Sequence, residues 1–191
     1  MNKFHYFIPT FFYTVEVAAH REIKELLLDK ILETGGDTPW TLCNAKSSFE
    51  KPNTLLRDCK PLTESIWSGY DQLLEEPFIA NTYGSKRPSS STFNIWYNIY
   101  EVGDYQEVHN HIGDKSDRYS FIYILHDESD TGVCFRSSNP NELNYSNISS
   151  IHSKKVGVEE GTLVLFPSFV DHYVLPATGS RVTISGNINS V

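Results

Sequence analysis

The chain has 191 residues, with 16 Lys or Arg and 24 Asp or Glu, and carries a formal net charge of -8 at pH 7. This length is typical of one domain with a core of ordinary size. The acidic balance excludes the basic surface that drives binding to the phosphate backbone of nucleic acids, so we expect one domain, residues 1–191, without a nucleic-acid partner.

The cysteines and the hydropathy pattern bear on the compartment. Cys43, Cys59 and Cys134 include no close pair, which indicates neither a disulfide framework nor a zinc knuckle and favours a reducing environment. The first residues lack the continuous apolar stretch of a signal peptide, and no segment approaches the roughly 20 apolar residues that cross a bilayer. We expect a cytoplasmic protein that has no membrane partner.

The first part of the chain has helical patterns. Over residues 14–33 apolar side chains recur at steps of three and four, and Gly35 follows the run, which predicts an amphipathic helix. A second helix is predicted from about Thr63 until Pro77 stops it. Residues 37–60 show no clear period.

From residue 91 the period changes to two, as in a strand with two distinct faces. Turn-rich segments, among them a polar loop at residues 137–147, separate the later apolar runs. Helices followed by many short strands predict a mainly β fold, an antiparallel barrel or sandwich buttressed by the helices. The further strand candidates are residues 119–126, 132–136, 162–166, 172–175 and 181–188.

Three histidines form the pattern that carries chemistry. His109 and His111 are two residues apart, so on an extended chain their side chains share one face. His172 comes much later and opens another predicted strand. Two clustered ligands and one distant ligand are typical of a facial triad, which leaves coordination positions open for a bidentate cosubstrate and O₂.

Arg181 lies in an apolar run nine residues after His172. A guanidinium in such surroundings needs an anion, and its planar fork suits the distal carboxylate of 2-oxoglutarate. Thr183 on the same strand face and Tyr100 would add hydroxyl groups to this contact.

Other interpretations of these residues stay open. Arg181 could form a structural ion pair with an acidic neighbour, and packing in the core would account equally well for Tyr100 and for Tyr123, a further candidate for the cofactor pocket. Asn98 would either line that pocket or close a turn.

Taken in order, these features resemble the Fe(II)/2-oxoglutarate oxygenases of the prolyl 4-hydroxylase-like class, and most of all a branch of small oxygenases of bacteria and phages. The resemblance covers roughly residues 90–190. It rests on residues 96–100, on 103–111 with its His-Asn-His ending, on 161–168 with the turn Phe166, Pro167 and Ser168, on His172, and on 181–185 with Arg181.

The resemblance implies a double-stranded β-helix, or jelly roll, over residues 91–191, with residues 1–90 supplying helical support and the first strand. It matches His109 and His172 to the family histidines and Arg181 to the cosubstrate anchor. Most of the superfamily has an aspartate or glutamate where this chain has His111. The branch that the chain resembles most accepts His-x-His, so His111 is the expected third ligand, and Asp114 is the substitute carboxylate. The resemblance also implies that the protein is located in the cytoplasm of a bacterium or of a phage-infected host cell.

The implied reaction is hydroxylation of a C–H bond with Fe(II), 2-oxoglutarate and O₂, releasing succinate and CO₂, with ascorbate as a reductant. The implied substrate is a peptidyl side chain, prolyl first, or a small molecule, and the oligomeric state is left open. Two alternatives remain: a three-histidine cupin-type metalloenzyme that does not use 2-oxoglutarate, and a non-catalytic β-barrel binding or structural protein.

Overall fold

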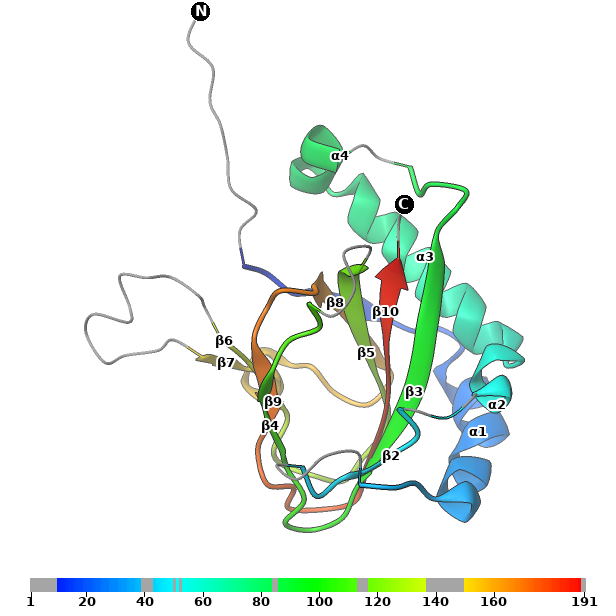
Figure 1. The fold of residues 1–191 in the computed structure, drawn as a ribbon, viewed down its shortest axis with the longest axis vertical. Coiled ribbons are helices and arrows are strands. Elements are labelled where there is room, and N and C mark those ends of the chain that lie inside the picture. Colours follow the sequence, from blue (N-terminus) through cyan, green and yellow to red (C-terminus); the bar gives the residue numbers. More distant parts are fainter. Residues whose placement is uncertain are drawn as a thin grey trace, which may run out of the picture.

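The computed structural model describes residues 10–38, 43–49, 51, 53–83, 86–112, 117–136 and 150–189. Two antiparallel sheets face each other, and the helices cover the outer face of the larger sheet (Figure 1). The predicted mainly β antiparallel fold with helical support is therefore confirmed.

The larger sheet has six strands and the smaller has four. In the larger sheet the order is β1 (Tyr13–Glu16), β8 (Thr162–Pro167), β5 (Asp117–Asp127), β10 (Arg181–Asn189), β3 (Thr92–Tyr100) and β2 (Lys46–Ser47). In the smaller sheet it is β4 (Gln106–His109), β9 (His172–Val174), β6 (Val133–Arg136) and β7 (Ser150–His152).

The larger sheet is buried on both faces, as strand β5 illustrates. Phe121 and Tyr123 belong to the apolar cluster on the helix side, while Ile122 and Ile124 belong to the cluster between the sheets. Successive side chains of a strand point to opposite faces, so this one strand contributes to two separate cores.

The helices of the described residues that pack on the outer face are α1 (His20–Thr34), α2 (Thr54–Arg57), α3 (Lys60–Glu75) and α4 (Pro77–Tyr83). Helix α1 buries Ile23, Leu27 and Ile31 at the spacing of one helix face. Helix α3 has a proline in its first turn, where no intrahelical N–H partner is lost. Among the described residues, no helix combines the length and apolar character needed to cross a membrane.

The structure corrects several predicted boundaries. The helix predicted over residues 14–33 begins only at His20, because residues 13–16 pair with β8 as strand β1. Strands β4 and β7 and the short helix η1 (Ser153–Val156) were not predicted. The polar loop predicted at residues 137–147 lies outside the described residues.

Candidate metal centre and cosubstrate pocket

The three predicted histidines meet between the two sheets. His109 at the end of β4 and His172 at the start of β9 are direct partners in the antiparallel ladder. His111 follows β4, and its backbone N–H donates to the carbonyl of Ser168 (2.8 Å). One ring nitrogen from each of the three lies within 4.8 Å of the other two.

Backbone carbonyls orient two of the rings. Nδ1 of His109 lies 2.8 Å from the carbonyl oxygen of Glu107, and Nδ1 of His172 lies 3.1 Å from that of Val170. Because a carbonyl oxygen can only accept, Nδ1 carries the proton in both rings. Each Nε2 is thereby left with its lone pair, the form in which imidazole binds a metal.

All three imidazoles are held neutral. Burial lowers the pKa of His111 to about 3, and burial also lowers the pKa values of His109 and His172. The cluster of candidate ligands found in the described part of the chain contains no carboxylate. Asp114, the predicted substitute ligand, lies outside the described residues.

Aromatic side chains hold the ring of His111, although this residue follows a strand rather than belonging to one. The ring of Trp96 stacks on it at 5.7 Å with an interplanar angle of 23°. The ring of His172 lies nearly parallel to that of His111 at 5.1 Å, and the two Nε2 atoms are 3.3 Å apart. Phe166 packs edge-on against His172 at 4.8 Å.

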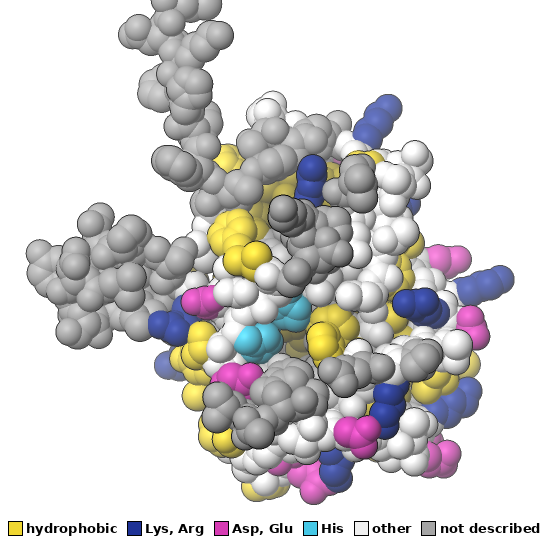
Figure 2. Space-filling model, in the orientation of Figure 1, with side chains coloured by type: hydrophobic (Ala, Val, Ile, Leu, Met, Phe, Trp, Pro, Cys, Tyr) yellow, Lys and Arg dark blue, Asp and Glu magenta, His cyan; other side chains and the backbone are white. Residues whose placement is uncertain are grey.

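A pocket of about 410 Å³, counting its open mouth, extends from the histidines to Arg181. Figure 2 shows histidine side chains in a depression of the surface, with hydrophobic side chains beside them. Of the predicted cofactor-binding residues, Asn98, Tyr100, Thr183 and Arg181 line this pocket. The histidines and Arg181 thus line one shared pocket.

The polar side chains of the pocket are already connected. The Tyr100 hydroxyl donates to Oε1 of Gln106 (3.0 Å), and the amide nitrogen of Asn98 is 3.4 Å from the Thr183 hydroxyl oxygen. Burial raises the pKa of Tyr100, so its phenol keeps its proton. A ligand entering here would meet hydroxyl and amide groups whose positions are fixed.

Arg181 is buried with a carboxylate partner that the sequence pattern did not identify. Its Nη2 lies 3.1 Å from Oδ2 of Asp127, whose side chain is fully buried. The same oxygen accepts from Nζ of Lys154 (2.8 Å), so one carboxylate faces two cations and the cluster keeps one positive charge. Nε of Arg181 is buried without a hydrogen-bond partner. Arg181 therefore lines the pocket and also forms the ion pair that was the alternative interpretation.

The structure does not place Tyr123 in the pocket. Its hydroxyl is 2.7 Å from Nδ1 of His20, and its ring packs in the core on the helix side of the sheet. The prediction that Tyr123 contributes to cofactor binding is wrong, because on β5 the pocket-facing residues are Ile122 and Ile124. Gln106 and Trp96, which also line the pocket, were not singled out from the sequence.

Residues 94–187 match the model of a family described as "Putative 2OG-Fe(II) oxygenase". Just under half of the chain is therefore similar to the 2OG-Fe(II) oxygenases. The matched segment contains all three histidines and Arg181, so the family match and the pocket coincide. No curated protein matches the sequence.

Solved structures share the fold of this chain, which is the double-stranded β-helix. A prolyl-4-hydroxylase of Pseudomonas putida has a TM-score of 0.63 and 16% identity, with 95% of this chain and 94% of that chain covered. A prolyl hydroxylase of Trichoplax adhaerens, in complex with a peptide fragment of the hypoxia inducible factor oxygen degradation domain, has a TM-score of 0.61 and 16% identity, covering 94% and 83%.

The same fold also occurs with another chemistry. The non-haem alpha-ketoglutarate-dependent carbocyclase SnoK of nogalamycin biosynthesis has a TM-score of 0.62 and 11% identity, with 95% of this chain and 80% of that chain covered. At these identities the likeness concerns the fold and does not show which substrate this chain uses.

Proposed function

We propose that this chain is an oxygenase that hydroxylates a C–H bond of its substrate with 2-oxoglutarate and O₂, using Fe(II) held by His109, His111 and His172. The observation that carries the proposal is one pocket lined both by three converging neutral imidazoles and by a cation, Arg181. A keto acid with a second carboxylate can bind a metal on the imidazoles and pair with the guanidinium.

The donor set fits an iron ion. Imidazole nitrogen suits Fe(II), and three ligands on one side leave positions open for a bidentate cosubstrate and O₂. The carbonyl partners of His109 and His172 supply the outer contacts that metal-binding histidines usually have. When bound, the metal together with 2-oxoglutarate and O₂ supplies the oxidising power, with succinate and CO₂ as products.

Arg181 binds the distal carboxylate in this proposal. Its cluster keeps one positive charge after Asp127 is counted, and its Nε has a free donor position. The Thr183 hydroxyl is two residues along the same strand face. The buried phenol of Tyr100 keeps its proton and can turn it from Gln106 to the bound carboxylate. The Asn98 amide fixes Thr183 from the neighbouring strand.

Apolar side chains shield the other walls of the pocket. Ile122, Ile124, Val133 and Val174 line it from both sheets. Such walls exclude water and strengthen the electrostatic contacts between Arg181 and a bound anion.

We infer a peptidyl substrate, with proline as the first side chain to test. Two of the structures with the same fold are prolyl hydroxylases, one of them with a peptide bound. The competing class is a small molecule, because a carbocyclase shares the fold as well.

The test is succinate formation by purified protein loaded anaerobically with Fe(II), given 2-oxoglutarate and ascorbate, and then exposed to O₂. Wild type, His172→Ala and Arg181→Ala are compared without added substrate and then with proline-containing peptides. Glu159→Gln, on an exposed residue, serves as the control variant.

We expect succinate from wild type and from the control, none from His172→Ala, and recovery of Arg181→Ala when 2-oxoglutarate is raised. Metal binding without 2-oxoglutarate turnover would move the assignment to a three-histidine enzyme that does not use this cosubstrate. Absence of both metal binding and turnover would favour a non-catalytic binding protein.

A further inference from the structure

Just before the end of β5, the alternation of its side chains between the two faces is interrupted. The interruption coincides with an irregularity in the ladder with β10. Thr183 lies opposite Ile124, but Val182 lies opposite His126, so Leu125 has no direct partner. An extra residue of this kind is a β-bulge, which shifts the alternation of the strand by one. Regular alternation after Ile124 would have put His126 on the pocket face, but the bulge brings Asp127 opposite Arg181 instead.

Glu160 binds the backbone at this point. It precedes β8, and the ladder between β5 and β8 ends at Tyr123 and Leu163. Beyond that pair the backbone N–H of Asp127 donates to Oε2 of Glu160 (3.0 Å). The side-chain carboxylate thus takes the place of a strand carbonyl beside the bulge.

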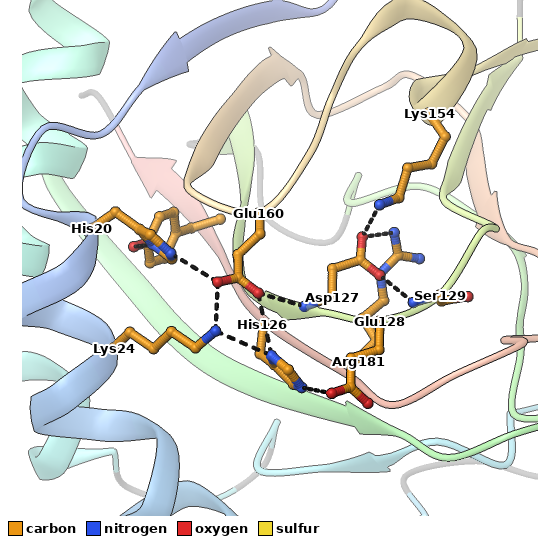
Figure 3. A network of polar contacts seen from close by, with 10 residues as sticks. His20, Lys24, His126, Asp127, Glu128, Ser129, Lys154, Glu160 and Arg181 are labelled. Carbon is orange, nitrogen blue, oxygen red and sulfur yellow. Dashed lines mark hydrogen bonds and ion pairs between the residues drawn. The ribbon is translucent and has the colours of Figure 1, made fainter.

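Helix α1 in turn holds Glu160, as Figure 3 shows. Oε1 of Glu160 accepts from Nζ of Lys24 and lies 3.1 Å from Nε2 of His20. Nδ1 of His126 is 3.2 Å from Oε2. Burial opposes ionisation, but the hydrogen bonds from Lys24, His20 and the Asp127 backbone lower the pKa of Glu160 to about 2. A charged carboxylate therefore joins the helix to the bulge.

The continuous chain of contacts runs from α1 through Glu160 to the backbone of Asp127, and from the Asp127 carboxylate to Arg181 (Figure 3). Oδ1 of Asp127 also accepts from the backbone N–H of Ser129 (3.0 Å), which fixes the second oxygen. The orientation of the guanidinium is consequently set by groups outside the pocket.

We propose that Glu160 is a positioning residue for the anion-binding arginine: by holding the bulged backbone of Asp127, it aims Arg181 at the distal carboxylate of the cosubstrate. This inference rests on the proposed function. It predicts that a change at Glu160, which does not line the pocket, selectively weakens binding of a ligand that carries the second carboxylate.

The experiment uses the full chain loaded with Mn(II) and measures dissociation constants by calorimetry, well below the unfolding temperature. The ligands are 2-oxoglutarate and 2-oxobutanoate, which keeps the keto acid group but lacks the distal carboxylate. The variants are Glu160→Gln and Lys24→Met, a milder change at the same junction. Glu159→Gln removes the same charge from the exposed neighbouring residue and is the matched control.

We expect Glu160→Gln to weaken 2-oxoglutarate binding roughly tenfold, within the range of couplings between contacting residues. Lys24→Met should change it in the same direction by less, while 2-oxobutanoate binding and the control stay as in wild type. Unchanged 2-oxoglutarate binding in both variants, or equal weakening of the two ligands, would overturn the positioning role. Wild-type protein that binds Mn(II) but no 2-oxoglutarate would instead overturn the proposed function, and with it this inference.

Discussion

At the scale of single residues, the unusual feature of the site is His111, where most of the superfamily that the chain resembles has a carboxylate. A neutral imidazole leaves a metal site more positive by one charge than a carboxylate would. The ring is buried against Trp96 and His172, so its protonated form is strongly disfavoured. We therefore expect His111 to act as a neutral ligand over the physiological pH range.

Substitution of His111 tests this expectation. His111→Ala removes a donor and should weaken Fe(II) or Co(II) binding by more than the roughly 10–100-fold that loss of an outer contact costs. His111→Asp restores the more common donor set and should keep metal binding. Competition with a fluorescent chelator measures both constants. Wild-type affinity in His111→Ala would show that His111 is not a ligand, and Asp114→Asn would then be the next variant to measure.

At the scale of elements, strand β10 is central because it pairs with both β3 and β5. One face of it carries Arg181 and Thr183 into the pocket, and the other packs Ile184 and Ile188 in the helix-side core. Gly186 on that second face faces Phe121 across the ladder. A Cβ atom there would come within 2.2 Å of the Asn94 carbonyl oxygen and 2.4 Å of the Phe121 ring.

Gly186→Ala should therefore destabilise the protein by roughly 1–3 kcal/mol, the usual cost of overpacking, because a backbone carbonyl cannot move aside as a side chain can. Gly69→Ala in α3 is the comparison, since its Cβ would meet the end of the Leu163 side chain. The loss of stability in this variant should be smaller. Urea unfolding midpoints measure both. Equal losses in the two variants would contradict this explanation.

At the scale of the whole molecule, the candidate metal site joins the two sheets. His109 and His172 belong to the smaller sheet, and the pocket wall opposite them, with Thr183, belongs to the larger one. Three neutral imidazoles without a metal contribute little to stability: His172 is buried, His109 and His111 are half-buried, and this partial loss of water lowers their pKa values. A metal ion at this site would bind the folded protein and not the unfolded chain, and would therefore stabilise the fold.

Metal addition should accordingly raise the unfolding temperature. At a free metal concentration about 100 times the dissociation constant, the gain is about 2.7 kcal/mol, or roughly 5–10 °C for a chain of this size. Differential scanning calorimetry with and without Mn(II) measures the shift, and His172→Ala should abolish it. A shift of the same size in His172→Ala would place the bound metal elsewhere.

Local patterns in the sequence determined much of this protein. The alternation of β3 and of β10, the periodicity of α3 and the candidate residues His109, His111, His172 and Arg181 could all be recognised without coordinates. They could be recognised because a side chain's face follows from its position in a strand or helix, and because ligand chemistry restricts the residue types. In the structure, His172 lies beside His109 and His111, as expected from its position at the start of a later strand.

Only the tertiary structure decided the contacts that depend on pairing between distant strands. The bulge at Leu125 exchanged His126 for Asp127 on the pocket face, and residues 13–16 became a strand because β8 offered an edge. Tyr123 belonged to the helix side for a similar reason, since the register of β5 fixes which of its faces meets the pocket. A one-residue change of register reverses every side chain of a strand, and that register is set by long-range packing that no local period records.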